Sequence, residues 1–320
     1  MNGVFEGFDD IADLAEGLDD PEPGARIMAV IELTDSADPA ALPHLARAIK
    51  DPDAGVRLLA AQGLTDFDGP ETAEALVGAL LDDDQKVRLA AATSLTELKD
   101  PEAGTPLIPL LTAPAEFVQV ACLNGIKELR RADALGPAIE ALESGSPAVR
   151  CAAVGVIGWL QDEGALPALI RAAADTDPAV RRAAVAAFGF SGSDHAEKAL
   201  IAALRDDDWQ VRESAAETLA KSGSPGCAGP LMGALEDDFW QVRLKAVRSL
   251  GKLGMREAAM RIGPMMNMPI PNLRKECAAV LGELAVAESV VFLADHENDS
   301  DPDVRKNVRW ALERIAKGAA

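Results

Sequence analysis

Residues 82–92, Asp82-Asp83-Asp84-Gln85-Lys86-Val87-Arg88-Leu89-Ala90-Ala91-Ala92, decide the fold, because variants of this stretch return every 31 residues along the chain. The position of Arg88 is filled in the same series by Arg26, Arg57, Arg150, Arg181, Arg212, Arg243, Arg274 and Arg305, and once by Gln119. A fixed period of this length is typical of proteins in which each structural unit packs only on its neighbours. The sequence therefore predicts a repeat architecture.

Each repeat carries two apolar stripes with helical spacing. Around the arginine, an apolar residue stands one position before it, a small one three after it and a large one seven after it, as at Val87, Ala91 and Leu95. These offsets lie on one face of a helix, which we name helix A. The second stripe lies twelve and eight positions before the arginine, as at Leu76 and Leu80, and predicts helix B, often opened by proline.

Stacked helix pairs explain the whole chain. A pair of about 31 residues is too small to bury both of its stripes, so neighbouring pairs must cover them. We therefore predict an all-α protein, an α-solenoid of ten 31-residue helix-pair repeats with half-repeat ends. It forms one domain over 1–320, with an N-terminal capping helix within 1–20 and a C-terminal capping helix within 302–320.

The turn before helix A carries an aspartate six residues ahead of the arginine in seven repeats. We expect this carboxylate to accept N–H groups at the helix start and to bind the arginine of an adjacent repeat. Repetition in nearly every turn favours a structural ladder over a catalytic array of carboxylates. In the fourth repeat Ala113 and Gln119 replace both residues, which we interpret as joint loss of two partners. The predicted ladder comprises Asp51, Arg57, Asp82, Arg88, Asp175, Arg181, Asp206, Arg212, Asp237 and Arg243.

The repeat unit resembles a known class. The segments 82–92 and 175–184 are similar to HEAT-like repeats of the phycobilisome-lyase type, and the resemblance covers residues 9–317. It implies an α-solenoid but leaves the function open. Proteins of this class include bilin lyase subunits, phycobilisome-degradation factors, an iron-dependent deoxyhypusine hydroxylase and bacterial interaction proteins.

Composition and charge narrow the choice of partners. The chain has 320 residues, 48% apolar and only 4% aromatic, with a formal net charge of −21. This charge repels phosphate backbones and anionic lipid, so we expect neither nucleic acid nor membrane as a partner. Residues 1–80 hold 4 basic against 17 acidic side chains, whereas residues 241–320 hold 13 against 10. We therefore expect a partner with a basic surface near the N-terminal end.

The remaining sequence signals argue against a leader segment, a disulfide framework and catalysis. Residues 1–20 contain no basic side chain, and Cys122, Cys151, Cys227 and Cys277 form no Cys-x-x-Cys pattern, which favours the cytoplasm. Cys122 and Cys277 fall in core positions, whereas the reactivity of Cys151 and Cys227 stays open. A single His-Glu pair, His296-Glu297, is too few ligands for a di-iron centre. We predict no enzyme, no metal and no cofactor.

Four aromatic residues depart from the repeat. Trp209 and Trp240 stand three positions before the arginine in consecutive repeats, and we expect them to lie side by side as an anchor for a partner. Trp159 and Phe190 stand nine positions after it, where other repeats carry charged residues. Local packing of each ring is the alternative in both cases.

Two further departures suggest binding surfaces. The ninth turn replaces the acidic consensus by Met265, Met266 and Met268, which suits either an adaptable contact surface or gap-filling in the core. The exposed side of helix B carries small residues such as Gly78 and Gly233, and we expect this layer to form the concave wall of the solenoid.

These observations favour a non-enzymatic scaffold, adaptor or assembly factor that binds a partner protein through its concave face and its exposed aromatic patches. The alternative, which rests on the resemblance alone, is a bilin lyase-like or other tetrapyrrole-handling subunit.

Overall fold

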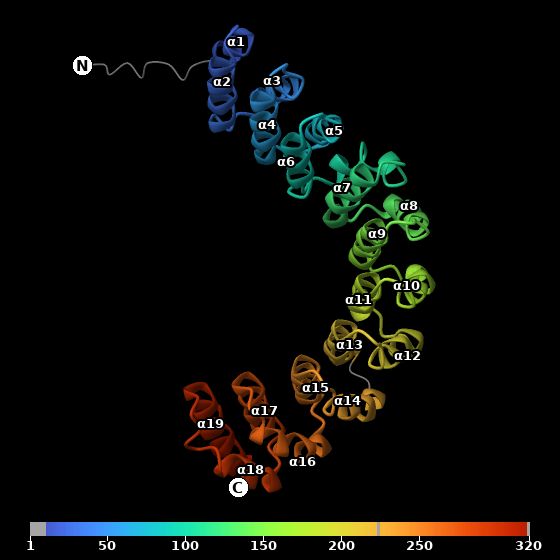
Figure 1. Cartoon of the computed structure of the whole chain (residues 1–320), viewed down its shortest axis with the longest axis vertical. Coiled ribbons are helices and arrows are strands. Elements are labelled where there is room, and N and C mark those ends of the chain that lie inside the picture. The colour runs from blue at the N-terminus through green and yellow to red at the C-terminus, as the bar shows by residue number, and fades with distance from the viewer. Residues whose placement is uncertain (1–10, 223–224, 319–320) are drawn as a thin grey trace, which may run out of the picture. The chain divides into compact units, whose positions relative to one another are not determined.

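The computed structural model describes residues 11–222 and 225–318, and every regular element in these ranges is helical (Figure 1). The chain forms two compact units, Met1–Ala165 and Leu166–Ala320, and each is described separately below. The expectation of one domain over 1–320 stays a prediction. Residues 1–10 of the N-terminal cap and residues 319–320 of the C-terminal cap lie outside the described residues.

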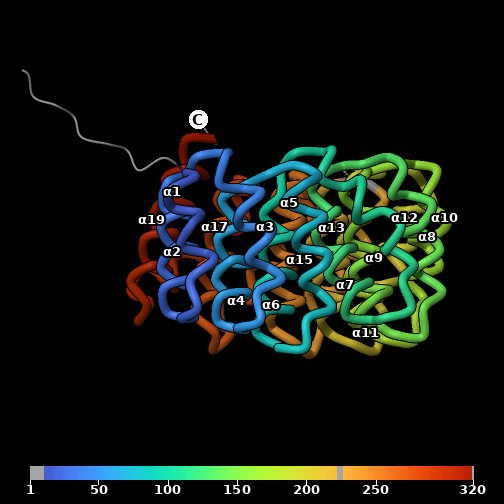
Figure 2. Tube along the Cα trace, turned by 90° about the horizontal axis from the view of Figure 1, so that it is seen from above, coloured from blue at the N-terminus to red at the C-terminus, as the bar shows by residue number. Residues whose placement is uncertain are grey.

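Unit 1 consists of two layers of helices. Helices α2, α4 and α6 lie side by side in chain order in Figures 1 and 2, and α2 packs on α4 as α4 packs on α6. The A layer contains α2 (Pro23–Asp35), α4 (Ala54–Gly63), α6 (Gln85–Leu95), α7 (Glu116–Ile126) and α9 (Pro147–Leu160). The B layer contains α1 (Ile11–Glu16), α3 (Leu42–Ala48), α5 (Pro70–Ala79) and α8 (Leu135–Ala141).

The helix B expected between α6 and α7 is absent. Its place is taken by two 3₁₀ turns, η4 (Pro101–Gly104) and η5 (Ile108–Leu110). Pro109 lies in the interior of the expected helix, where it removes an N–H donor and clashes with the preceding turn. Leu107 and Leu111 nevertheless remain fully buried, so the stripe predicts the core positions correctly although the helix does not form.

Unit 2 repeats the two-layer plan. Its A layer contains α11 (Pro178–Ala187), α13 (Trp209–Ser222), α15 (Trp240–Lys252), α17 (Pro271–Leu284) and α19 (Pro302–Gly318). Its B layer contains α10 (Leu166–Ala172), α12 (Asp194–Ala203), α14 (Ala228–Ala234), α16 (Ala259–Ile262) and α18 (Val290–Ala294).

The A helices of unit 2 lie on the inner side of its curve and the B helices on the outer side (Figure 1). The prediction that helix B lines a concave wall is therefore wrong for this unit. The hydrophobic stripes show which residues pack between the layers but carry no information on the direction of bending.

The core between the layers is built from the predicted offsets. Val56 and Ala60 of α4 and Leu64 directly after it are completely buried. Leu45 and Ile49 of the B layer are buried as well, and α3 packs on α4. Small residues at the middle offset allow neighbouring helices to approach closely. The core therefore needs few aromatic side chains, in agreement with the composition.

Arginines of the A helices bind aspartates of the following repeat. Arg57 donates from Nε to Asp82 Oδ2 at 2.6 Å and from Nη2 to Asp82 Oδ1 at 2.9 Å. Its Nη1 donates to the backbone oxygen of Asp51 in its own turn at 2.8 Å. The same bidentate contact joins Arg26 to Asp51, Arg181 to Asp206, Arg212 to Asp237 and Arg274 to Asp299. We call each of these contacts a rung.

The helix caps are made by a different aspartate from the one expected. Asp53, four residues before the arginine, accepts the N–H groups of Gly55 and Val56 at the start of α4. Asp51, six residues before it, binds Arg26 and accepts one backbone N–H group, that of Asp53. Asp84, Asp177, Asp208 and Asp301 cap their helices as Asp53 does. Helix capping and arginine binding, which were both expected of one aspartate, are thus performed by two different aspartates.

The ladder also corrects the interpretation of the fourth repeat. Since each rung joins residues 25 positions apart, the partner position of Arg88 is Ala113. Gln119 is not part of that rung, and its Nε2 donates to the backbone oxygen of Leu111 at 2.8 Å. Arg88 therefore keeps its place while its carboxylate partner is missing, contrary to the joint loss that the sequence suggested.

Candidate partner-binding surface

An aromatic stack lies at the start of α13 and α15. Trp209 stacks on Phe239, with ring centroids 5.3 Å apart and an interplanar angle of 7°. The guanidinium carbon of Arg212 lies 5.6 Å from the Phe239 centroid. Trp209 thus pairs with Phe239 rather than with Trp240. Phe239 is 41% exposed, so the stack keeps an apolar surface open to solvent.

Phe239 was missed by the sequence analysis, although the signal is in the repeat. It occupies the N-cap position of α15, where Asp53 and Asp208 cap their own helices, and its side chain makes no capping hydrogen bond. An aromatic residue in place of a cap gives up about 1 kcal/mol of helix stabilisation. Replacement of a capping residue is therefore a departure from the repeat that marks a candidate binding residue as clearly as the tryptophans do.

Trp240 lines a cavity between α13, α15 and α17. The cavity has a volume of about 290 Å³, and Leu244, Arg248 and Glu276 also contribute to its wall. All of its lining residues come from A helices, on the side turned away from the B layer. We call this side of α13, α15 and α17 the inner face of unit 2.

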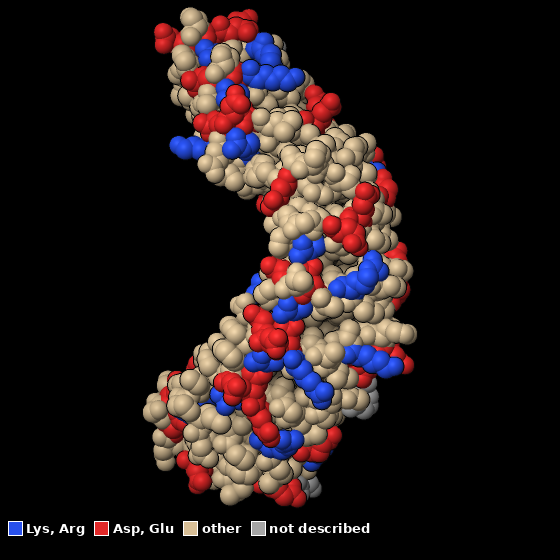
Figure 3. Space-filling model, turned by 45° about the vertical axis from the view of Figure 1, so that its right-hand side comes forward, with Lys and Arg blue, Asp and Glu red and all other residues tan. Residues whose placement is uncertain are grey.

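Ion pairs surround this cavity. Arg248 donates to both carboxylate oxygens of Glu276 at 2.8 Å, and Lys245 donates to Glu217 at 2.8 Å. The hydrogen bond from Lys245 lowers the pKa of the Glu217 carboxyl group. Basic and acidic side chains lie next to one another over this part of the chain, in the lower half of Figure 3. The wall of the cavity therefore combines two apolar side chains, Trp240 and Leu244, with six polar or charged ones.

The second predicted aromatic pair is divided between the two units. Trp159, in α9 of unit 1, is 38% exposed, and the guanidinium carbon of Arg130 lies 5.4 Å from its ring centroid. Phe190 lies in η9 (Phe188–Phe190) of unit 2 and is half-buried. A shared patch of these two residues stays a prediction.

The methionine turn is mostly core. Met265 and Met266 are buried, which favours gap-filling in the core over the contact surface for these two residues. Met268 is half-buried, and its Sδ lies 3.9 Å from Nη1 of Arg243. Met268 occupies the position where a rung aspartate would stand, and Nε of Arg243 is buried without a hydrogen-bond partner. Two of the three methionines of this turn therefore belong to the core.

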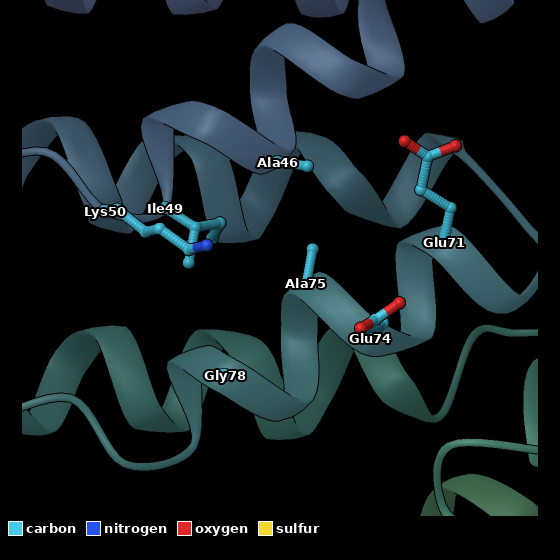
Figure 4. Close-up of a pocket in the computed structure, with 7 residues that line it drawn as sticks. All are labelled: Ala46, Ile49, Lys50, Glu71, Glu74, Ala75 and Gly78. Atoms are coloured by element: carbon cyan, nitrogen blue, oxygen red, sulfur yellow. The ribbon is translucent and has the colours of Figure 1, made fainter.

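A groove opens between the B helices α3 and α5 of unit 1 (Figure 4). It has a volume of about 370 Å³, and Ala46, Ala75 and Gly78 form its floor. Glu71 and Glu74 stand at one end of it. Gly78, one of the small residues predicted on the exposed side of helix B, thus lines a groove that lies between two B helices.

Exposed apolar side chains on α6 and α7 were also missed. Leu89 is 49% exposed and Phe117 is 37% exposed. In the 31-residue register they correspond to Leu244 and Asn272, which line the cavity of unit 2. Large apolar residues in this register therefore lie on the A-helix side of unit 1.

Reactive groups are sparse in the described part of the chain. Burial raises the pKa of the Cys122 thiol to about 12, and Cys227 and Cys277 are also buried. Within residues 11–222 and 225–318, no three His, Cys, Asp or Glu side chains come together as metal ligands would. His296 Nδ1 lies 3.0 Å from the backbone oxygen of Phe292. No helix in these ranges has the length and apolar character required to cross a membrane.

Comparisons with solved structures find the same architecture. Yeast importin-β (Kap95p) aligns with a TM-score of 0.66 at 14% identity, over 96% of this chain and 52% of Kap95p. YibA of E. coli gives 0.54 at 16% identity, over 90% and 96% of the two chains. An engineered protein gives 0.51 at 20% identity, over 96% and 99%. The chain thus spans about half the length of Kap95p, and at these identities the likeness concerns the fold.

Family comparison is more specific than structure comparison here. A search of curated proteins found no match. The comparisons support neither the assignment of these repeats to the phycobilisome-lyase type nor a bilin-handling role. A model of HEAT repeats, however, matches residues 11–96, 47–121, 104–189, 166–238 and 228–313. Because these matches run through both units, the chain belongs to the HEAT-repeat family.

Proposed function

We propose that the protein is a non-enzymatic scaffold that binds a partner protein through the inner face of unit 2. The observation that carries this proposal is the cavity beside Trp240 and Leu244, close to the exposed stack of Trp209 and Phe239. HEAT-repeat solenoids with this fold include Kap95p, whose structures are described as complexes with RanGDP and with Nup1.

The chemistry of the inner face supports protein binding. Aromatic residues in well-packed, partly enclosed positions carry much of the binding energy at protein interfaces, and a charged surround excludes water and sets orientation. Lys245, Arg248 and Lys275 are already paired with carboxylates, so the rim presents alternating rather than single-sign charge. Such a surface suits a partner segment with both apolar and polar side chains.

The charge distribution adds a second element to the proposal. The first 80 residues hold 4 basic against 17 acidic side chains, which favours a basic surface on the part of the partner that meets this end. Binding at this end should weaken as ionic strength rises, because exposed charges are screened over about 10 Å at 0.1 M salt.

Affinity capture from the native host with matched variants tests the proposal. We expect Trp240→Ala with Phe239→Ala to lose specific captured proteins that the unmodified chain retains. Met260→Ala is the control, because Met260 is an exposed apolar residue on α16 in the B layer. The proposal fails if both proteins capture the same set, with equal melting temperatures showing that both are folded.

A further inference from the structure

Arg88 is positioned like the arginines that form rungs, but the described part of the chain supplies no carboxylate for it to bind. Its Nη1 donates to the backbone oxygens of Asp82 at 2.6 Å and Asp83 at 3.0 Å. Arg57 is held by the equivalent bonds to Asp51 at 2.8 Å and Pro52 at 3.1 Å, and its free edge binds Asp82. In the described ranges, Nε and Nη2 of Arg88 have no hydrogen-bond partner.

The position that faces Arg88 is small. Residue 113 is alanine, so the chain supplies no carboxylate at the position where the other rungs hold aspartate. The incomplete rung of unit 2 differs, because Met268 stands at the equivalent position with its Sδ 3.9 Å from Arg243. One incomplete rung thus has an apolar side chain next to its arginine, whereas the other has only the methyl group of Ala113 at the equivalent position.

The surroundings of Arg88 are more favourable to the carboxylate of a partner than the surroundings of the other arginines are. The turn that faces it reads Ala113-Pro114-Ala115, whereas the turn that faces Arg57 reads Asp82-Asp83-Asp84. The facing turn therefore adds no carboxylate to the Asp82, Asp83 and Asp84 of Arg88's own turn, whereas Arg57 has acidic residues in both of the turns that it joins. Leu89 and Phe117, the exposed apolar residues of α6 and α7, belong to the same two helices that flank this turn.

We infer that Arg88 and the turn at Ala113 form an open rung that binds an aspartate or glutamate side chain of a protein partner. The carboxylate takes the two bonds that Asp82 takes from Arg57, and apolar neighbours of that residue contact Leu89 and Phe117. Because the N-terminal part of the chain is strongly acidic, the flanking residues of the partner segment are neutral or basic. This inference rests on the proposed scaffold function and adds a site in unit 1.

Two labelled peptides provide the test. The probe is a fluorescein-labelled, C-amidated peptide, Lys-Leu-Asp-Leu-Lys, and its reference carries asparagine in place of aspartate. A charge-assisted bidentate contact should make the aspartate peptide bind about tenfold more tightly to the full chain. Fluorescence anisotropy measures both dissociation constants, and the NMR signal of the Arg88 Nε–H group reports where the carboxylate binds.

Ala113→Asp is the decisive variant. It supplies the missing carboxylate from within the chain, so the preference for the aspartate peptide should disappear while the melting temperature rises. Met268→Asp is the matched control, because it adds the same group to a rung of unit 2 and should leave the preference unchanged. Equal binding of the two peptides to the unmodified chain would overturn the inference. So would a preference that survives in Ala113→Asp, or an Ala113→Asp protein without increased stability.

The peptide test is independent of the capture experiment. If the peptides bind equally while host proteins are still lost from the inner-face variant, the open rung is wrong and the scaffold proposal stands. If the peptide preference is found but no host protein depends on Trp240 and Phe239, the inner face is wrong.

Discussion

Nε of Arg57 lies 2.6 Å from Oδ2 of Asp82, a residue 25 positions further along and in the next repeat. The same guanidinium donates from Nη1 to the backbone oxygens of Asp51 and Pro52 in its own turn. One side chain thus joins two consecutive turns. The contact stabilises the interface between repeats rather than either helix pair alone, and the stack depends on interfaces of this kind.

Removal of one carboxylate from the ladder should destabilise unit 1. Asp82→Asn leaves the half-buried guanidinium of Arg57 without its bidentate partner, and we expect a loss of about 1–2 kcal/mol in the free energy of unfolding. Urea denaturation followed by circular dichroism measures it. Asp83→Asn, at an exposed neighbour that accepts no rung bond, is the control and should change stability by less than about 0.5 kcal/mol. Equal losses in both variants would show that the rung itself contributes nothing.

Stability should fall in acid because of the same rungs. The hydrogen bond from Arg57 lowers the pKa of Asp82, and the bond from Arg274 lowers that of Asp299. A carboxyl group whose pKa is lowered in the folded state stabilises it fully above its unfolded pKa of about 4. This stabilisation is lost as pH falls through the lowered, folded-state pKa values. Urea midpoints measured from pH 7 to pH 2 should therefore decline below about pH 4, and less steeply in Asp82→Asn. An unchanged slope in the variant contradicts this assignment.

The sequence predicted the repeat and the core offsets, because each recurs with the period, and it predicted that arginines bind aspartates of an adjacent repeat. It did not show which of the two adjacent repeats supplies the partner, and two arginines of the predicted ladder, Arg88 and Arg243, form no rung with an aspartate. Arg88 and Ala113 form the incomplete rung, yet Ala113 and Gln119 share one repeat and look like partners in the sequence. The period shows which positions are equivalent in successive repeats. Which turns lie next to one another depends on how neighbouring repeats stack, and the period does not show this.

Single departures from the repeat were harder to interpret for a related reason. Met266 is completely buried, and Trp209 stacks on Phe239, a residue that the sequence analysis did not single out. The orientation of a side chain that replaces a consensus residue depends on the space that its own neighbours leave. The direction of bending in unit 2 likewise depends on the sizes of facing side chains across many helices, which no single position reveals.

Completion of the second incomplete rung should stabilise unit 2. Met268→Asp places a carboxylate beside Arg243, whose Nε is buried without a hydrogen-bond partner. We expect a gain of about 1 kcal/mol, because a new charge-assisted bond outweighs the loss of a half-buried thioether. Thermal and urea unfolding measure the gain. Met268→Asn has nearly the same shape without the charge and should gain less, so equal effects would exclude a charge-assisted rung.

Two helical glycines should respond in opposite ways to the same substitution. A Cβ atom added at Gly78 in α5 has no atom within 4 Å, so Gly78→Ala should stabilise the chain by about 0.5–1 kcal/mol through helix propensity. At Gly282 in α17, the same Cβ would lie 2.6 Å from Cζ3 of Trp310 and 2.8 Å from Cα of Ala311.

The tryptophan ring can rotate, but the backbone of α19 can move only if the two helices separate. Gly282→Ala should therefore destabilise unit 2 by about 1–3 kcal/mol, as overpacking does in other cores. Gly233→Ala, in the open position of α14 equivalent to Gly78, is the control and should behave as Gly78→Ala does. A stabilised Gly282→Ala protein would mean that α17 and α19 do not approach as closely as this contact requires. The close approach explains why a residue of low helix propensity stands in the last turn of this 14-residue helix.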